Sequence, residues 1–409
     1  MSMEVNIAVL GIYDTKKEEF EYLEEQIRKA GASVTTIDVG SKKLTDKIAD
    51  FSCEHVVAKV NKSMNEVSCM PRREAIHVVA EGARKIVKEL VDAGKIHGVI
   101  GMGGSGGTTL SAAIMNGLPI GFPKLIVSTL ASTIRIGAFV VGSDTLVLNP
   151  ITDVSGINYI TDRVLRQAAG AIVGAAKSSL IESQEANKPR IALTMYGLTT
   201  QGVIAAKQWL EESGYEVIIF HAVGSGGKAM ETLIADGFFQ GVLDMTTTEV
   251  SSHVLGSASS DAGPGRLSGA ALTGIPQVVC PGAMDMVGAV NFEPFKTRQV
   301  YCHSEGPSHF RPNVQDNERI GKYFAEKLNQ SIAPCVLFFP LKGLSQIGVE
   351  GGELYNPEAD NALFDAIRKN LDREKVQLIE CDNAINDVVF AVSMAKMLDS
   401  FIKDKLVQK

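Results

Sequence analysis

A run of glycines constrains what this chain can fold into more than any other feature. Five of the seven residues from 101 to 107 are glycine, between an apolar segment at 96–100 and a helix-like segment at 110–115. Glycine permits tight turns, positive φ and close approach of a ligand to the backbone. Between a strand and a helix, such a loop offers clustered N–H groups and the positive end of a helix dipole. The sequence predicts an α/β fold with an anion site, most often for phosphate; a tight turn without a ligand is the alternative.

The loop differs from two common nucleotide motifs. It satisfies G-x-G-x-x-G, but the dinucleotide fingerprint also needs an acidic residue about 20 positions later. The next expected strand, at 125–127, ends in Ser128 and Thr129 instead. No Gly-Lys-Ser/Thr follows the glycines, which excludes a Walker A motif. The pattern favours phosphate or nucleotide binding and argues against a standard NAD site and a P-loop ATPase.

The composition limits the class of protein. With 409 residues the chain is long enough for two or three domains, and 45% apolar and 21% charged residues are typical of a soluble globular protein. A net charge of −7 gives no support to nucleic-acid binding. We see no run of eighteen apolar residues and no signal peptide, so we expect no membrane segment. Six scattered cysteines without a C-x-x-C pair indicate reduced thiols in a cytoplasmic protein and no zinc site.

The chain opens with a βαβ pattern. An apolar strand is expected at 4–10, and the loop after it carries Asp14, Thr15 and Lys16. Ligands of open α/β sheets bind beyond the carboxyl ends of the strands, where these side chains would lie. The other interpretation is helix capping, because Thr15 and Glu18 have capping-box spacing.

The segment before the glycine loop gives weaker signals. Residues 55–60 fit a strand, and Pro71 leads into a helix that ends at Gly94. Arg72 and Arg73 at its start could bind a phosphate, because guanidinium suits bidentate anion contacts. A solvated surface is the alternative for this pair.

A polar segment at 182–189 divides the sequence, and the βαβ pattern restarts after it. "IAVLGIYDT" near the N-terminus can be laid over "IALTMYGLT" in the second half. We therefore expect two successive Rossmann-like domains with mainly parallel sheets, at 1–182 and 190–409.

The second half lacks a glycine loop at the matching position and offers polar loops at expected strand ends. There we expect Arg266 to hold an anionic group, Asp261 or Glu249 to accept a proton, and His303 or His253 to donate one. The alternative is that these groups cap helices and bond to one another. A shared cleft would favour catalysis.

Several motifs together resemble one family. "YDTKKEE", "GMGGSGGT", "TTTEV", "DAGPGRLSGA", "CPGAMDMV" and "PLKGLSQIGVEGGELYNPEADNALF" occur in the order found in the Tm-one-like ATP-binding domain family. The resemblance covers nearly the whole chain and implies two Rossmann-like domains, ATP on the first, and a homodimer. The nucleotide-contacting positions that it implies are Asp14, Thr15, Lys16, Gly101, Gly103, Gly104, Ser105, Gly106, Gly107, Thr108, Ser128 and Thr129.

These observations lead to one main functional expectation and two others. The first is an ATP-binding protein whose nucleotide phosphates lie on the 101–108 loop, with or without Mg²⁺. The second is an enzyme acting on a small anionic metabolite in a cleft between the domains, with ATP as cosubstrate. The third is a partner-binding protein that ATP stabilises. We expect neither nucleic acid nor a membrane as partner.

Overall fold

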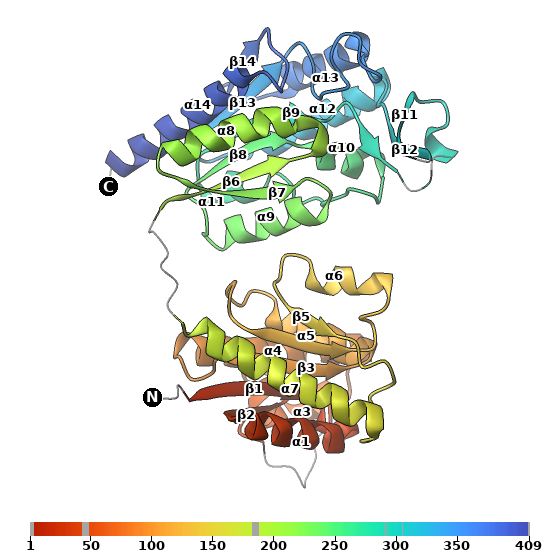
Figure 1. Cartoon of the computed structure of the whole chain (residues 1–409), viewed down its shortest axis with the longest axis vertical. Helices are drawn as coiled ribbons and strands as arrows, with labels where there is room; N and C mark the ends of the chain where they lie inside the picture. The colour runs from red at the N-terminus through yellow and green to blue at the C-terminus, as the bar shows by residue number, and fades with distance from the viewer. Residues whose placement is uncertain are drawn as a thin grey trace. The chain divides into compact units, whose positions relative to one another are not determined.

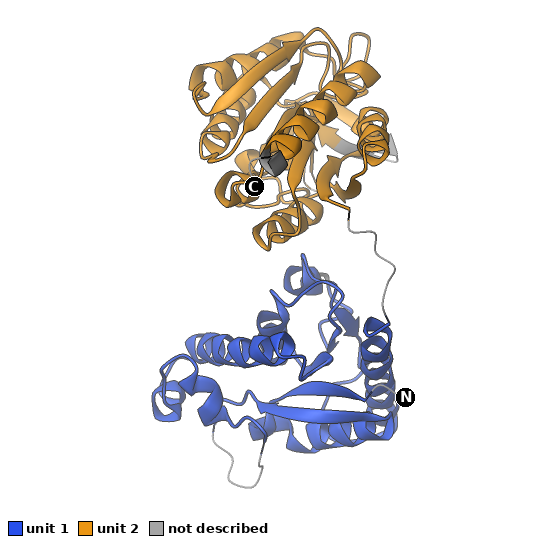
Figure 2. Ribbon diagram, turned by 90° about the vertical axis from the view of Figure 1, so that its left-hand side faces the viewer, with its two compact units in different colours: residues 1–185 blue, residues 186–409 orange. Residues whose placement is uncertain are grey.

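The computed structural model describes residues 4–42, 49–181, 188–289, 291, 293–304 and 306–407. The chain forms two compact units, residues 1–185 and 186–409 (Figure 2). Residues 182–187, most of the polar segment expected to separate two domains, lie outside the described residues.

Unit 1 is built on a parallel sheet with the strand order β2-β1-β3-β4-β5 (Figure 1). Its strands are mostly buried apolar runs, as expected when helices cover both faces of a parallel sheet. Their bounds are β1 (Val5–Gly11), β2 (Ala32–Asp38), β3 (Gly98–Gly103), β4 (Lys124–Ser128) and β5 (Leu146–Leu148).

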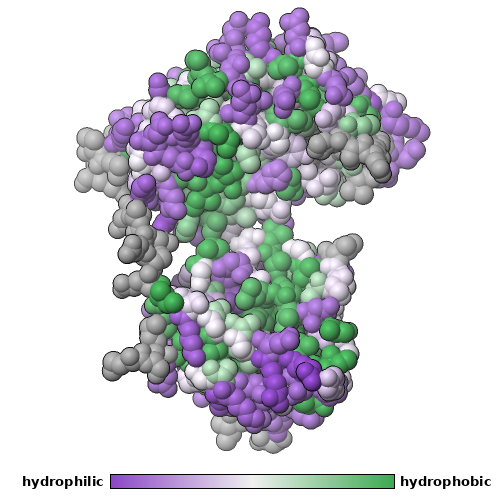
Figure 3. Space-filling model, viewed as in Figure 1, coloured by the Kyte–Doolittle hydropathy of each residue, from purple (hydrophilic) through white to green (hydrophobic). Residues whose placement is uncertain are grey.

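Helices pack on both faces of this sheet, and successive side chains of β1 point to opposite faces. Ile7 and Val9 join a core with α1 (Tyr13–Lys29) and α7 (Tyr159–Ser179). Ala8 and Leu10 join the other core. That second core contains α2 (Cys53–Ala58), α3 (Met64–Ser68), α4 (Arg72–Asp92) and α5 (Ser105–Met115). Figure 3 shows hydrophilic residues gathered over α1, whose outward face carries charged side chains.

Two local predictions for unit 1 are wrong. Residues 55–60 are mostly helical, because the hydroxyl of Ser52 accepts a hydrogen bond from the His55 N–H and caps α2. Gly82 of α4 lets α2 approach closely, and the valines of α2, Val56 and Val57, are buried at this contact. The capping box at Thr15 is also absent, because α1 already begins at Tyr13, with Ile12 at its N-cap.

Unit 2 has a parallel sheet in the order β14-β13-β9-β8-β6-β7 and a small antiparallel sheet in the order β10-β12-β11. The strands are β6 (Arg190–Met195), β7 (Glu216–His221), β8 (Gly241–Thr246), β9 (Gln277–Gly282), β10 (Val287–Gly288), β11 (Val300–Ser304), β12 (Gly306–Phe310), β13 (Cys335–Pro340) and β14 (Val376–Cys381). Counted along each unit, the first five parallel strands follow the same 2-1-3-4-5 order in both units. The predicted α/β class with mainly parallel sheets is confirmed.

Helices cover both faces of the larger sheet of unit 2 as well (Figure 1). On one face lie α8 (Thr200–Glu212) and α14 (Val388–Val407). The other face and the loops carry α9 (Ser225–Ala235), α10 (Thr248–Leu255), α11 (Gly269–Thr273), α12 (Val314–Leu328) and α13 (Pro357–Asn370). Among the described residues, no helix combines the length and apolar character needed to cross a bilayer.

Candidate functional site

The strand order of unit 1 identifies the edge of the sheet where a ligand would bind. In a 2-1-3-4-5 sheet the chain leaves β1 and β3 toward opposite faces, which opens a crevice beyond their carboxyl ends. The loop after β1 carries Asp14, Thr15 and Lys16, and the glycine loop follows β3. Two segments that lie about 90 residues apart in sequence therefore meet because β1 and β3 are neighbours.

A cavity of about 690 Å³ lies at this position, within the range of small-molecule sites. Loops after β1, β2 and β3 line it, together with the start of α4. Its polar and glycine lining residues are Asp14, Thr15, Lys16, Ser41, Lys42, Ser68, Arg72, Gly103, Gly104, Ser105, Gly106, Gly107 and Asp153. The structure thus brings together eight of the twelve residues that the sequence predicted for a nucleotide.

The glycine loop leaves the start of α5 open. Gly104 is the N-cap residue, and no side chain of the described residues caps the helix. The first backbone N–H groups of α5 are therefore available to an acceptor from outside the chain. Gly107 packs closely, since a Cβ there would lie 2.6 Å from the Met102 carbonyl oxygen. At Gly104 a Cβ would meet only the Thr129 hydroxyl, at an ordinary 3.6 Å.

The other four predicted residues support the loop and do not line the cavity. Gly101 allows α5 to pack on β3, since a Cβ there would lie 2.1 Å from the Ser111 hydroxyl. The hydroxyls of Thr108 and Ser128 are buried and 2.6 Å apart. Thr129 donates its N–H to the carbonyl of Gly103 at 3.2 Å. The ligand contacts expected at these four positions stay predictions, and the contacts seen there hold the glycine loop in place.

Charged side chains surround the cavity. A carboxylate oxygen of Asp14 accepts hydrogen bonds from the N–H groups of Ser41 and Lys42, both at 3.1 Å, and so holds the loop after β2 at the cavity. The ammonium of Lys16 donates to the backbone carbonyl of Val154. Sequence reasoning missed Ser41 and Lys42, although their place directly after β2, next to β1 in the sheet, was the available signal.

A buried carboxyl group lies beside this loop. Asp38, the last residue of β2, accepts a hydrogen bond from the Gly40 N–H at 2.9 Å. Burial raises the pKa of Asp38 to about 6, and the negative charge of Asp14 adds to that rise. The carboxyl group of Asp38 therefore changes its charge near pH 6.

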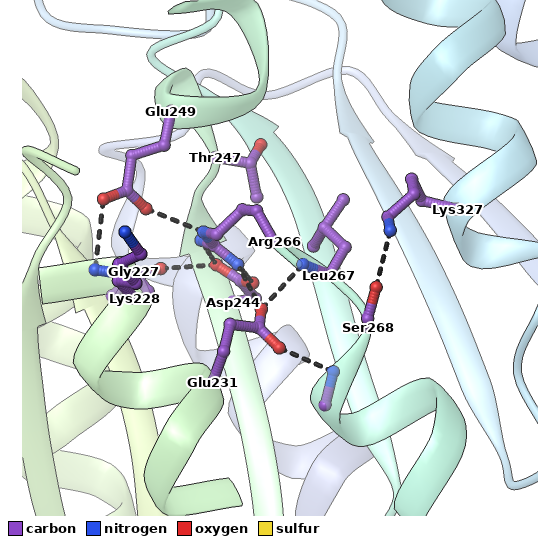
Figure 4. A network of polar contacts seen from close by, with 12 residues as sticks. Gly227, Lys228, Glu231, Asp244, Thr247, Glu249, Arg266, Leu267, Ser268 and Lys327 are labelled. Atoms are coloured by element: carbon purple, nitrogen blue, oxygen red, sulfur yellow. Dashed lines mark hydrogen bonds and ion pairs between the residues drawn. The ribbon is translucent and has the colours of Figure 1, made fainter. Parts of the chain in front are cut away.

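In unit 2 the predicted anion-binding arginine is buried and already paired (Figure 4). The Arg266 side chain is 1% exposed, and its guanidinium donates to Asp244 and Glu249, each at 2.7 Å. Glu231 lies 3.3 Å away on the same guanidinium. The prediction that Arg266 would hold an anionic substrate does not fit, because three carboxylates of the chain already neutralise it. Glu249 is fully buried and does not fit as a proton acceptor for a substrate.

Glu249 fills a second glycine loop, which sequence reasoning missed. Residues 224–227 read Gly-Ser-Gly-Gly after β7 and form the N-cap and first turn of α9. The N–H groups of Gly224 and Gly227 donate to one carboxylate oxygen of Glu249, at 2.6 and 3.1 Å. The glycines are visible in the sequence, but they follow β7 and not β8, the strand that matches β3 of unit 1. In unit 2 a side chain of the protein occupies the place of an anion.

The remaining catalytic candidates divide into a pair and a single residue. His253 Nδ1 lies 3.0 Å from a carboxylate oxygen of Asp261, and both side chains are partly exposed. Asp261 also accepts a hydrogen bond from the Gly263 N–H at 2.6 Å. The carboxylate thus fixes the orientation of the His253 ring through one of its nitrogens. The His303 side chain lies outside the described residues.

Comparisons with known proteins cover almost the whole chain. The chain is 41% identical over 401 residues to a UPF0261 protein of Clostridium tetani, covering 97% of this chain and 98% of that one. It is 34% identical over 426 residues to the ToMV resistance protein Tm-1(GCR237) of Solanum lycopersicum, covering 96% of this chain and 55% of the tomato protein.

A solved structure of UDP-GlcNAc 2-epimerase from Neisseria meningitidis is 9% identical and covers both chains fully. Its TM-score is only 0.25, so it carries no functional argument. Residues 5–180 match the N-terminal domain and residues 188–402 the C-terminal domain of one uncharacterised protein family. With both domains matched and close relatives along its full length, the chain belongs to the UPF0261 family, which includes Tm-1-like proteins.

Proposed function

We propose that unit 1 binds ATP with its phosphates against residues 103–107. The observation that carries the proposal is the cavity of about 690 Å³ at the β1/β3 crevice, with an uncapped helix start on its wall. Phosphate groups suit such a site because backbone N–H groups and the helix dipole both favour negative charge. The choice of adenine rests on the resemblance of the motifs to an ATP-binding family.

The charges around the cavity support an anionic ligand. Lys16, Lys42 and Arg72 line it against two carboxylates, Asp14 and Asp153. Asp14 already accepts two backbone hydrogen bonds, which reduces its repulsion of a phosphate. Arg72 lies over the loop, since its guanidinium is 3.2 Å from the Cβ position of Gly106. A guanidinium here can bind a phosphate with two parallel hydrogen bonds.

The second glycine loop of the chain provides an internal comparison. Both loops follow a parallel strand and open a helix of eleven residues. In unit 2 the N–H groups bind the carboxylate of Glu249, so this loop geometry does attract negative charge. In unit 1 the N–H groups of residues 104–107 donate to no side chain of the described residues. An external anion is the corresponding ligand.

The test is the affinity for ATP of Gly104→Val, measured by calorimetry. The Cβ has room beside Thr129, so the fold should persist, while the added methyl groups cover the N–H groups of the first turn. Each lost charge-assisted hydrogen bond corresponds to roughly tenfold or more in affinity. Gly170→Val is the control, because that glycine lies in α7 with no atom within 4 Å of its Cβ position. Unchanged ATP affinity in a folded Gly104→Val protein would remove the proposal.

The enzymatic alternative is separated from binding alone by turnover. Production of ADP or AMP during incubation of the purified protein with ATP would make the nucleotide a cosubstrate. Saturable binding without product would leave a binding or regulatory protein. The cytoplasmic location and the homodimer expected from the sequence stay predictions, and size-exclusion chromatography with light scattering tests the latter.

A further inference from the structure

A second cavity of unit 1, of about 630 Å³, lies next to the first along the start of α5. The two cavities share Arg72, Ile76, Ser105 and Gly106 as lining residues. The first cavity extends to the loops after β1 and β2, and the second extends along α4 and α5 and reaches Arg135. We call the second cavity the α4/α5 groove.

Helical spacing explains the walls of the groove. On α4, Arg73, Ile76, His77 and Ala80 are three or four residues apart, which places them on one face of the helix. On α5 the positions 105, 109 and 113 repeat every four residues and form a matching stripe. The two helices pack against each other, so the stripes form the two sides of one groove.

The charge of the groove is positive and uncompensated. Arg72, Arg73 and Arg135 line it and are exposed, and no aspartate or glutamate is among its lining residues. Within the described part of the chain, none of these three arginines has a carboxylate within 4 Å, although the chain carries a net charge of −7. Arginines that gather in a concave site without acidic partners are suited to bind an anion.

The groove also offers apolar contact and hydroxyl groups. Ile76, Ala80 and Ala113 supply apolar surface, and Thr109 lies between Ser105 and Ala113 on the α5 side. A concave site with a mainly apolar wall and a few convergent polar groups is the usual form of a small-molecule site. A bare inorganic anion would leave this apolar wall unused.

We propose that the α4/α5 groove binds a second small ligand, an organic anion with a carboxylate or phosphate group and an apolar body. Its anionic group contacts Arg73 and Arg135, and its apolar body lies along Ile76 and Ala80. Arg72 stands between this ligand and the cavity beside it. The proposal rests on the shape and charge of the groove and does not require a nucleotide in the first cavity.

The experiment uses three simple probes of similar size with the full-length protein. Benzoate and phenyl phosphate carry the two candidate anionic groups, and benzamide is the neutral counterpart. Ligand-observed saturation-transfer NMR measures weak binding of such fragments in the millimolar range expected for small ligands. We expect binding of at least one of the two anions and no binding of benzamide. The stronger of the two anions identifies the chemical group of the natural ligand.

The variant Arg73→Gln/Arg135→Gln tests the position, because these two arginines line only the groove. We expect the Kd of the anion to rise at least about tenfold, since charge-assisted contacts to arginine are lost. Arg84→Gln is the matched control, an exposed arginine on the same helix outside the groove, and should leave the Kd unchanged. Equal binding by the double variant, or by benzamide, would overturn the proposal.

An ATP titration of the same double variant separates this inference from the proposed function. We expect unchanged ATP affinity, because neither substituted residue lines the first cavity. If the variant loses ATP and the anion by the same factor, the groove is an extension of one ligand site and the inference of a second ligand is wrong. If wild-type protein binds the anion but not ATP, the groove stands and the proposed function fails. If the wild-type protein binds ATP but neither anion, the proposed function stands and the inference of a second ligand is wrong.

Discussion

Replacing Arg266 with methionine removes the cation from the buried carboxylates of unit 2. Asp244 and Glu249 are at most 2% exposed and lie 2.7 Å or less from this guanidinium. Breaking a buried ion pair by removing one partner costs about 3–5 kcal/mol, because the other charge stays uncompensated. Domains of this size unfold with about 5–15 kcal/mol. We therefore expect Arg266→Met to remove at least about a fifth of the stability of unit 2.

The loss should depend on pH in a defined direction. Burial already raises the pKa of Glu231, and Arg266 opposes that rise. Without the guanidinium the folded-state pKa of Glu231 increases further above its unfolded value. The folded state then binds more protons, so stability falls as pH rises through the interval between the two values. The difference between wild type and Arg266→Met should be larger at pH 8 than at pH 5.

The chain contains an assay specific for this unit. Trp209, the only tryptophan, lies on α8 of unit 2, so its fluorescence during urea unfolding reports on unit 2 alone. Arg319→Met is the matched control, an exposed arginine of the same unit that, among the described residues, donates only to the Val254 carbonyl. It should change stability by about 0.5 kcal/mol or less. A denaturation midpoint of Arg266→Met equal to that of the control, at both pH values, would refute the reasoning.

Two further predictions concern unit 1. Gly82→Ala should destabilise unit 1 by about 1–3 kcal/mol in calorimetry, because the new Cβ would lie 2.1 Å from the Val56 carbonyl oxygen. This clash should outweigh the higher helix propensity of alanine. At Gly170, where the Cβ position has no neighbour within 4 Å, the same change to alanine should instead stabilise the unit by up to about 1 kcal/mol. The pKa of Asp38 is raised to about 6. As pH rises from 4 to 6, the free energy of unfolding of the wild type should therefore fall by up to about 3 kcal/mol relative to that of Asp38→Asn. A difference between the two proteins that stays constant over this pH range would contradict the prediction.

The sequence was sufficient for most of the fold because its signals there are local. The strand at 335–340 is a continuous buried apolar run, and α13 begins with Asn356 capping before Pro357. The error at 55–60 came from β-branched residues, whose strand preference was outweighed by packing of α2 against Gly82. Such packing depends on a helix about 25 residues later in the chain, which local patterns do not show.

The candidate site was predictable only in part for the same reason. The glycine loop was predictable from its composition, and Asp14, Thr15 and Lys16 were predictable from their place after a strand. The pairing of Arg266 with three carboxylates could not be read from residue types, because an arginine beside acidic residues looks the same whether it is exposed or buried. The partners lie 17 to 35 residues from Arg266 in sequence and meet it only through the order of the strands.

The carboxylate of Glu249 is tied to its glycine loop by the chain itself. A tethered ligand acts at a high effective concentration, which a free anion at cellular levels cannot match. The loop at 224–227 is thus closed to phosphate compounds by an internal competitor, although it has the strand, glycines and helix start that such compounds use. Two glycine loops of similar sequence, one after β3 and the other after β7, can in this way differ in ligand binding through a single side chain. The difference needs no change in either sheet.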